Sequence, residues 1–226
     1  MAIFRCELSS GSRKTGQSAK AKIDYISRQE KYADHSDRCI HFESKLPIGF
    51  DSPQQFWNAA DKHERANARL FQEFKLTLPI EQKQNIPAQI EAVKEFIEQT
   101  IPNHPYSFAI HEGKGTNPHA HLVFSERVMD GVEREIGTFF KRANKKNPEL
   151  GGAAKNRALK STDFLIDARK SWATCVNKSL QKHASMRQKV FGKVPQVDHR
   201  SRKDRGLEPV APAHLTKAIE DKIKNT

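Results

Sequence analysis

Apolar residues alternate with polar ones in four short segments of the chain, and this pattern predicts β-strands. The segments are residues 2–8, 74–78, 106–110 and 119–125. Successive side chains of a strand point to opposite faces of a sheet, so each segment would present one apolar face to a core. Pro79 ends the second segment, because proline cannot donate a hydrogen bond to a neighbouring strand.

Longer segments have the apolar spacing and the end signals of helices. We expect helices over about residues 18–32, 53–70, 87–101 and 162–182. Ser18 can cap the first helix, and Ser52 followed by Pro53 is a strong helix start. Residues 33–51 are predicted to be irregular, and the basic, glycine-containing residues 139–160 are predicted to form a loop or surface insertion.

Strands interleaved with helices predict an α/β or α+β domain whose helices cover the sheet. The segments 106–110 and 119–125 are separated by a short loop, so they form a hairpin and at least this part of the sheet is antiparallel. We expect one folded domain over residues 1–195. Residues 196–226 are expected to be a charged segment that packs on the domain and then leads into a linker.

Positive charge is concentrated towards one end of the chain. The 226 residues have a net charge of +12. Residues 1–140 carry 18 basic and 19 acidic side chains, whereas residues 141–226 carry 21 and 8. Segregation of this kind favours a polyanionic partner, because contacts with phosphates release condensed counterions. A solvated, solubilising tail is the alternative explanation.

Apolar content and cysteine usage exclude several classes of protein. No segment approaches the roughly 20 apolar residues that a membrane-spanning helix needs, so no membrane insertion is expected. The three cysteines, Cys6, Cys39 and Cys175, lie far apart and form no CxxC motif. A disulfide scaffold and a cysteine-ligated zinc site are therefore not expected, and the cytoplasm is the expected location.

Three of the ten histidines lie within eleven residues, around the predicted hairpin. His119 and His121 are two residues apart, so they project from the same face of a strand, and His111 lies at the opposite lip of the loop. Three converging imidazoles could hold Zn, Ni, Cu, Mn or Fe and leave positions open for a substrate. The alternative is that they are ordinary surface or core histidines.

Two further residues could act with such a metal site. Tyr25 is predicted to lie on the polar, basic face of the first helix, where it is either an ordinary half-exposed ring or a phenol presented to an anion. Glu73 lies on the polar face of its strand. It could accept a hydrogen bond from a metal-binding histidine, remove a proton from Tyr25, or be a plain surface residue.

Several segments in this order resemble the MobA/MobL family of conjugative relaxases, in particular the MobA branch of broad-host-range mobilizable plasmids. They are Gly16–Tyr25, Leu70–Pro79, His111 with Asn117–His121, Phe140–Asn144, Gly151–Ala153, Asp167–Trp172, Val176 with Asn177 and Leu180, Val197–Ser201 and Arg205–Gly206. The resemblance covers nearly the whole chain. It departs at Ile26, where the family often has arginine, and at Lys75, where the family often has a second acidic residue.

The resemblance implies a fold and an enzymatic activity. The fold would be the largely antiparallel HUH-type sheet of relaxases and replication initiators, with helices behind it. The activity would be metal-dependent nicking of one DNA strand at a plasmid origin of transfer by transesterification, followed by religation after transfer. Tyr25 would be the nucleophile that becomes covalently linked to the 5′ phosphate, with His111, His119 and His121 as metal ligands and Glu73 beside them.

The resemblance also implies cofactors and partners. The cation would be Mg²⁺ or Mn²⁺, with Zn²⁺ as the alternative, and no nucleotide cofactor is expected. The DNA would be the single-stranded or hairpin origin, and accessory mobilization proteins and a type IV secretion coupling protein would be partners in a bacterial cytoplasm, with transfer to the recipient cell. A further domain, such as a primase, follows in some members. Basic residues expected near DNA are Arg13, Lys14, Lys20, Lys22, Lys114, Lys141, Arg142, Lys145 and Lys146.

Three rival functions remain at this point. A three-histidine metallonuclease would use bound water in place of Tyr25. A basic DNA-binding module without catalytic activity would use the histidines only for structure. A replication initiator or single-strand transposase would share the histidine motif but not the matches elsewhere in the chain.

Overall fold

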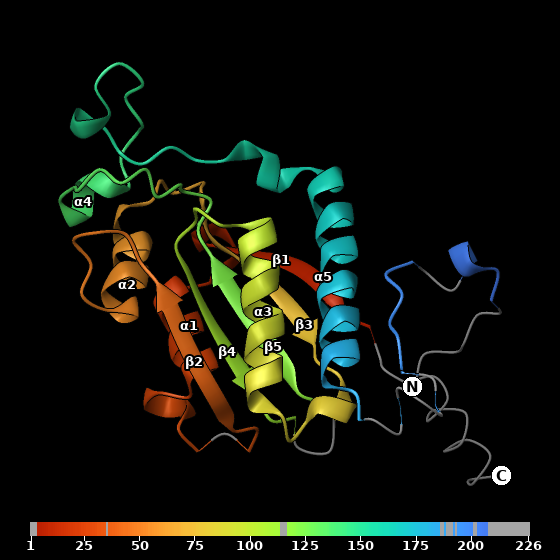
Figure 1. The fold of residues 1–226 in the computed structure, drawn as a ribbon. Helices are drawn as coiled ribbons and strands as arrows, with labels where there is room; N and C mark the ends of the chain where they lie inside the picture. The colour runs from red at the N-terminus through yellow and green to blue at the C-terminus, as the bar shows by residue number, and fades with distance from the viewer. Residues whose placement is uncertain are drawn as a thin grey trace, which may run out of the picture.

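A five-stranded sheet forms the centre of the computed structural model, which describes residues 4–34, 36–113, 117–185, 188, 192, 194–200 and 203–207. The strands are β1 (Cys6–Ser12), β2 (Cys39–Lys45), β3 (Arg69–Thr77), β4 (Tyr106–His111) and β5 (His119–Phe124). Their order across the sheet is β1-β3-β5-β4-β2, and every neighbouring pair is antiparallel (Figure 1). The expected α+β fold with an antiparallel sheet is confirmed.

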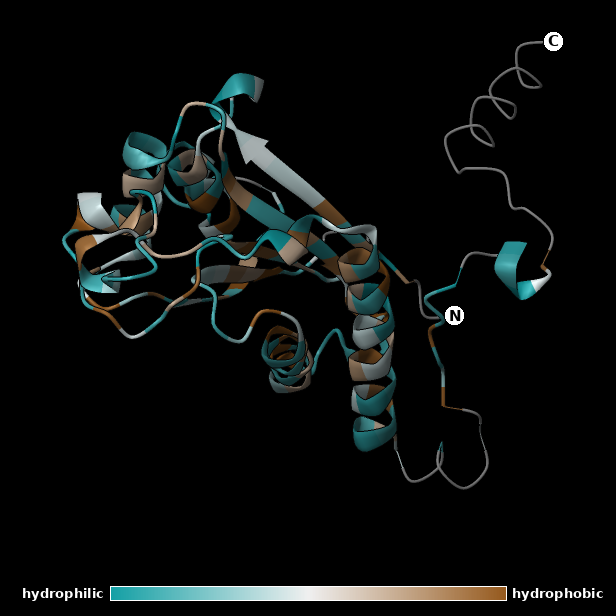
Figure 2. Cartoon of the chain, turned by 90° about the horizontal axis from the view of Figure 1, so that it is seen from above, coloured by the Kyte–Doolittle hydropathy of each residue, from teal (hydrophilic) through white to brown (hydrophobic). Residues whose placement is uncertain are grey.

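Helices cover both faces of this sheet. The helices are α1 (Ala19–Ser27), α2 (Pro53–His63), α3 (Ile86–Thr100), the short α4 (Ile136–Phe139) and α5 (Thr162–His183). Figures 1 and 2 show α3 and α5 together on one side of the sheet, and α1 and α2 on the other. Within the part of the chain that the structure describes, no helix combines the length and the apolar character needed to cross a bilayer.

The larger core lies between the sheet and the helices α3 and α5. Phe74 of β3 and Leu122 of β5 are fully buried there, and Phe96 of α3 and Trp172 of α5 pack against them. The rings of Phe74 and Phe124 stack with their centroids 5.5 Å apart. The apolar alternation of each strand supplies this face, so the opposite face of the same strands is left for other residues.

A second core lies between the opposite face and the helices α1 and α2. Ile23 and Ile26 of α1 and Trp57 of α2 are fully buried in it, next to Val123 of β5. The indole N–H of Trp57 donates a hydrogen bond of 2.9 Å to the hydroxyl of Ser107 on β4. This packing holds α1 directly over the strands that carry the three histidines.

The start of α1 is fixed by α2. As expected, the hydroxyl of Ser18 accepts a hydrogen bond of 3.1 Å from the N–H of Ala21. The carboxylate of Asp61 on α2 accepts hydrogen bonds from the Ser18 hydroxyl (2.6 Å) and from the N–H groups of Ala19 (2.7 Å) and Lys20 (3.0 Å). An anion at a helix N-terminus satisfies N–H groups that have no partner inside the helix, so this carboxylate anchors α1.

Two strands differ from the expectation. The first strand, expected at residues 2–8, lies at Cys6–Ser12 and so extends four residues beyond the expected end. Strand β2 lies within residues 33–51, which were predicted to be irregular. Residues Cys39–Ser44 are all half-buried, so β2 shows no alternation of buried and exposed positions; as an edge strand it forms because its backbone pairs with β4.

Two helices are shorter than expected. Helix α1 was predicted to reach about Tyr32 but ends at Ser27, because Arg28 has a left-handed backbone (φ 57°, ψ 46°) that cannot continue it. Helix α2 was predicted to continue towards Leu70 but ends at His63, and β3 begins at Arg69. The predicted helices at residues 87–101 and 162–182 match α3 and α5 closely.

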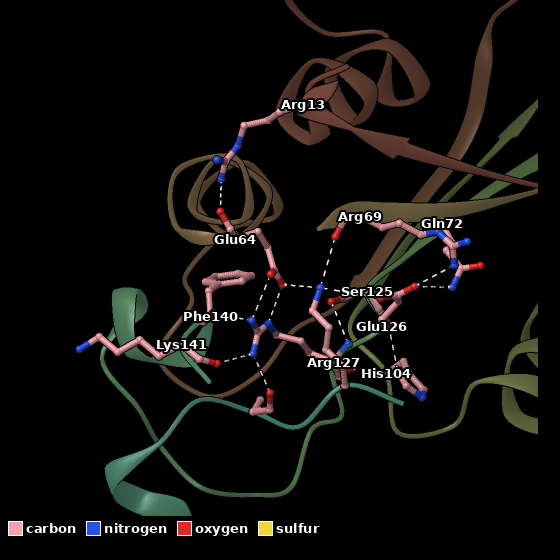
Figure 3. Close-up of polar contacts among 12 residues, drawn as sticks. Arg13, Glu64, Arg69, Gln72, His104, Ser125, Glu126, Arg127, Phe140 and Lys141 are labelled. Atoms are coloured by element: carbon pink, nitrogen blue, oxygen red, sulfur yellow. Dashed lines mark hydrogen bonds and ion pairs between the residues drawn. The ribbon is translucent and has the colours of Figure 1, made fainter. Parts of the chain in front are cut away.

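Buried arginines fix the basic segment 139–160. The guanidinium of Arg127 forms hydrogen bonds of 2.6 and 3.1 Å with the carboxylate of Glu64. It also donates to the carbonyl oxygens of Phe140, Lys141 and Ala153, so one side chain joins both stems of the segment (Figure 3). The side chain of Arg127 is only 5% exposed, which makes the Glu64 carboxylate its necessary counter-charge.

A second buried arginine and a close backbone contact complete the anchoring. The guanidinium of Arg134 bonds to the carbonyl oxygens of Pro148 (3.1 Å) and Gly151 (2.8 Å) and to the carboxylate of Asp130. A Cβ atom on Gly152 would lie 2.1 Å from the carbonyl oxygen of Lys141, so only glycine fits there. The segment is therefore a fixed part of the fold, although it contains only short helical turns.

Replacing Glu64 by glutamine should destabilise the protein strongly. The Glu64→Gln substitution leaves the charge of Arg127 buried beside a neutral amide, and breaking a buried pair in this way costs about 3–5 kcal/mol of unfolding free energy. Urea denaturation measures the loss, with Glu81→Gln at an exposed position as the control. A loss below about 1 kcal/mol for Glu64→Gln would contradict the role given to the pair.

Candidate metal centre and nucleophile

The register of the β4–β5 hairpin brings the three predicted histidines together. His111 is paired directly across the hairpin with His119, and His121 is paired with Ala109. The three imidazole rings have centroids 4.9 to 5.3 Å apart. Ala120 and Leu122, between and after the β5 histidines, point into the opposite core, as the alternation predicts.

The donor atoms of this cluster fit a metal ion. One nitrogen from each of His111, His119 and His121 lies within 4.8 Å of the other two. The nitrogens that hold one zinc ion lie about 3.4 Å apart, so His111, His119 and His121 would hold such an ion after a modest approach of their rings. Three neutral imidazoles suit first-row divalent cations and leave coordination positions open.

A chain of polar contacts links His121 to helix α1. The Nδ1–H of His121 donates to Glu73 Oε1 over 2.7 Å, and Lys22 Nζ on α1 donates to Glu73 Oε2 over 2.9 Å. Burial opposes ionisation of Glu73, but the hydrogen bond from His121 and the charge of Lys22 outweigh burial and lower the pKa of this carboxyl to about 2. The contact leaves Nε2 as the only nitrogen of His121 that can bind a metal.

His111 is held from two sides. Its Nε2 lies 2.7 Å from the carbonyl oxygen of Ile26, and its Nδ1 lies 3.1 Å from Nη2 of Arg28. Asp37 lies close to the same group: its carboxylate oxygen Oδ2 is 3.6 Å from Nε2 of His119 and 3.9 Å from Arg28 Nη2. The region before strand β2 thus contributes a carboxylate to the surroundings of the histidines.

Burial and nearby positive charge favour the neutral forms of His111 and His119. Loss of hydration lowers the pKa of His111 to about 4, and the charges of His121, Arg28 and His119 add to this effect. Burial and the neighbouring His121 also lower the pKa of His119. A metal ion binds the neutral form of imidazole, so the fold prepares both residues for this role at neutral pH.

Tyr25 lies beside the cluster. It projects from α1 with its ring edge-on to the ring of His121, at a centroid distance of 5.9 Å. The guanidinium of Arg28 lies 4.6 Å from the centre of the Tyr25 ring, and Nζ of Lys22 lies 5.5 Å from it. Tyr32 packs edge-on at 5.4 Å. Two positively charged side chains thus flank the phenol, and one of them, Lys22, also pairs with Glu73.

The basic residues expected near DNA fall into different environments. Lys20 pairs with Asp24 and Glu30, and Arg13 donates to the carbonyl oxygen of Glu64. Lys114 lies outside the described residues. Lys14 is exposed. These placements leave the DNA contacts of all of them as predictions.

Lys22 pairs with Glu73, and the remaining four are exposed on the anchored segment, on the side of the sheet where β5 ends (Figure 1). They are Lys141, Arg142, Lys145 and Lys146. Of their neighbours in the segment, Lys155 is half-buried and pairs with Glu64 and Glu126. Arg157 and Lys160 are also exposed, and Lys160 Nζ lies 3.6 Å from Glu126 Oε2. Four of the exposed basic residues therefore cluster within residues 141–146.

Sequence reasoning missed the parts of the site that come from outside regular elements. Asp37 precedes the unrecognised strand β2; because Cys39 pairs with His111, recognising that strand would have placed Asp37 near the histidines. The contact of Arg28 with His111 depends on the left-handed backbone that ends α1, and the apolar spacing of the helix does not indicate it. The pairing of Lys22 with Glu73 depends on how α1 packs on the sheet, which no local pattern indicates.

Comparison with known proteins decides the family. The family model for MobA/MobL matches residues 6–224. The chain belongs to the MobA/MobL family. The MobA/MobL match includes the β4–β5 hairpin and α1, so the histidines and Tyr25 lie inside the matched region.

Two curated proteins illustrate this membership. The chain is 41% identical over 218 residues to Mobilization protein A of Escherichia coli, a match that covers 95% of this chain and 29% of that protein. It is 35% identical over 222 residues to the 43 kDa relaxation protein of Salmonella typhimurium, covering 92% of this chain and 56% of that protein. The chain therefore corresponds to only part of each of these MobA/MobL relatives.

A solved structure has the same fold. The chain described under "Molecular Basis of Vancomycin Resistance Transfer in Staphylococcus aureus" superposes with a TM-score of 0.63 at 24% identity. The match covers 88% of this chain and all of that chain. At this identity the likeness establishes the fold of the MobA/MobL chain and no more.

Cation binding should release few protons near pH 6. Because the pKa values of His111 and His119 are lowered, both residues are already neutral where free histidines are half-protonated. We expect no more than about one proton to be displaced per Mn²⁺ bound between about pH 5.5 and 6.5. Calorimetry in buffers of different ionisation enthalpy counts these protons, and a count near three would contradict the lowered values.

Proposed function

We propose that this chain is a relaxase domain that nicks one strand of DNA at a plasmid origin of transfer with Tyr25 as the nucleophile. One observation carries the proposal: the ring of Tyr25 lies 5.9 Å from the ring of His121, within a cluster of three imidazoles that can hold a cation. A metal site alone is common to many nucleases. A tyrosine presented next to it supports transesterification.

The proposed reaction conserves the energy of the phosphodiester. The Tyr25 hydroxyl oxygen forms a bond to phosphorus, the bond from phosphorus to the 3′ oxygen breaks, and the proton lost by the phenol is balanced by the one gained by the 3′ hydroxyl. The product is a phosphotyrosyl diester at the 5′ end, so the reverse reaction rejoins the strand. A divalent cation held by His111, His119 and His121 would supply charge neutralisation on the phosphate oxygens.

Glu73 fits the role of a residue that orients His121. Its Oε1 accepts from His121 Nδ1, while its Oε2 is engaged by Lys22 (2.9 Å) and lies 3.4 Å from the hydroxyl of Ser9. Both oxygens thus have partners other than Tyr25. Mutation of a carboxylate that fixes the tautomer of a metal-binding histidine typically lowers the metal affinity 10–100-fold. We therefore assign Glu73 to orientation and not to proton removal from Tyr25.

The DNA would extend along the sheet. Strand β5 rises about 17 Å from His119 to Phe124, and Arg127, which holds the basic segment, lies three residues further on. At about 3.4 Å per nucleotide step, residues 141–146 would contact phosphates at least about five steps from the bond that is cut. A fixed and basic segment at this distance suits the hairpin or the flanking strand of an origin.

Family membership supports the remaining partners. Relatives are named for mobilization and relaxation, so we infer that the chain acts on an origin of transfer together with accessory mobilization proteins and a secretion coupling protein. We place this action in a bacterial cytoplasm, with Mg²⁺ or Mn²⁺ as the preferred cation and Zn²⁺ as the alternative. The main rival function remains a metallonuclease that uses water, and the following experiment separates the two.

The Tyr25→Phe variant should lose the covalent DNA adduct completely. It keeps the ring that packs against His121 but lacks the oxygen that attacks phosphorus. Labelled origin oligonucleotide is incubated with Mn²⁺ and protein, and denaturing gels with peptide mapping show whether residue 25 carries DNA. Tyr32→Phe is the matched control, because the ring of Tyr32 packs against Tyr25. This substitution removes only the hydroxyl of Tyr32 and should leave the adduct intact. Strand cleavage that persists in Tyr25→Phe would establish the water-using reaction.

Removing two charges of the basic segment should weaken DNA binding in a salt-dependent way. Each phosphate contact contributes about 0.7 to 0.9 to the slope of log affinity against log salt, so Lys145→Gln with Lys146→Gln should reduce this slope by about 1.4 to 1.8 on a long origin oligonucleotide. Adduct formation on an oligonucleotide of about four nucleotides around the cut should not change.

The control pair for this measurement is Lys178→Gln with Lys182→Gln. These lysines lie on α5, on the other side of the sheet from the histidines, and pair with Glu95 and Glu91. Equal slopes for the two double variants would refute the contact proposed for residues 145 and 146.

A further inference from the structure

Arg28 contacts several residues of the candidate site, and the proposed reaction assigns it no role. Its backbone has a left-handed conformation that residues other than glycine seldom adopt, and this conformation turns the side chain back over α1. The side chain is 7% exposed. Its Nη1 donates to the carbonyl oxygen of Tyr25 (2.9 Å) and its Nε to that of Asp37 (2.7 Å), so the guanidinium is held in one orientation.

The third nitrogen of this guanidinium blocks a metal-binding atom. A carbonyl oxygen only accepts hydrogen bonds, so the 2.7 Å contact with Ile26 places the proton of His111 on Nε2. The lone pair of His111 is then on Nδ1. Arg28 Nη2 lies 3.1 Å from that atom and donates to it. A cation and Arg28 therefore compete for the same lone pair.

The same guanidinium also packs on the proposed nucleophile, with its carbon 4.6 Å from the centre of the Tyr25 ring. Asp37 Oδ2, 3.9 Å from Nη2 and 3.6 Å from His119, offers the displaced charge a nearby partner. A movement of Arg28 away from His111 would change the packing of Tyr25 without moving the sheet.

We propose that Arg28 is a positioning residue that occupies Nδ1 of His111 in the cation-free protein, so that cation binding displaces its guanidinium and thereby couples the metal site to the position of Tyr25. The inference rests on the cation site of the proposed function. In this proposal the positive charge of Arg28 lowers the affinity of the site for the cation. Displacement of Arg28 then changes the packing of Tyr25.

Arg28→Gln should bind Mn²⁺ at least about tenfold more tightly than the wild-type protein, because a positive charge beside a ligand atom is removed. Electron paramagnetic resonance of free Mn²⁺ measures the affinity in the absence of DNA. The matched control is Arg38→Gln, which loses the same charge from a side chain that is 76% exposed and pairs with Glu112. Solvent screening should keep its affinity within about twofold of wild type.

A measurement on the wild-type protein tests the proposal even if Arg28→Gln does not fold. In ¹⁵N-histidine spectra, His111 should carry its proton on Nε2, and addition of Mg²⁺ or Zn²⁺ should shift the Nδ1 signal. With 3-fluorotyrosine incorporated, the ¹⁹F signal of Tyr25, assigned through Tyr25→Phe, should shift on the same addition. Perturbation of Nε2 in place of Nδ1, or an unchanged Tyr25 signal, would overturn the inference.

The outcomes separate the two proposals. If the wild-type protein binds no divalent cation, the cation site of the proposed function fails and the role of Arg28 fails with it. If the wild-type protein binds the cation but Arg28→Gln binds it equally well or more weakly, the role of Arg28 alone is refuted.

Discussion

The pairing of β4 with β5 is the constraint on which the candidate centre depends. It sets His111 opposite His119 and places His121 on the same face, while Leu122 fills the core behind them. A slip of one residue would turn the β5 histidines into that core and bring apolar side chains to the site. The free energy of burying the apolar face therefore also fixes the positions of the imidazoles, with no need for strained backbone at the histidines.

The second apolar layer gives the cluster its surroundings. Because Ile23 and Ile26 are buried against the sheet, α1 lies close enough for the carbonyl of Ile26 to contact His111 and for Lys22 to reach Glu73. Tyr25, on the same helix, then lies between these contacts. A helix covering only the far face of the sheet would have left the histidines open to water and without a tyrosine beside them.

Much of this arrangement could be predicted from the sequence, but not all of it. The alternation of residues 119–125 predicts which way His119 and His121 point, and the capping signal at Ser18 predicts where α1 begins. Strand β2 has no alternating pattern, since both of its faces are half-buried, so Asp37 could not be placed. The end of α1 at Arg28 was also missed, because its left-handed backbone goes with contacts to Asp37 and His111, which lie outside the helix.

The carboxylate of Asp61 gives α2 an influence over a site that it does not touch. It binds both the capping hydroxyl of Ser18 and the first N–H groups of α1, so the two helices behave as one unit at this end. Tyr25 lies less than two turns from that junction. A substitution in α2 that moves Asp61 would consequently shift Tyr25 relative to the histidines, so an outer helix shares control of the geometry at the inner one.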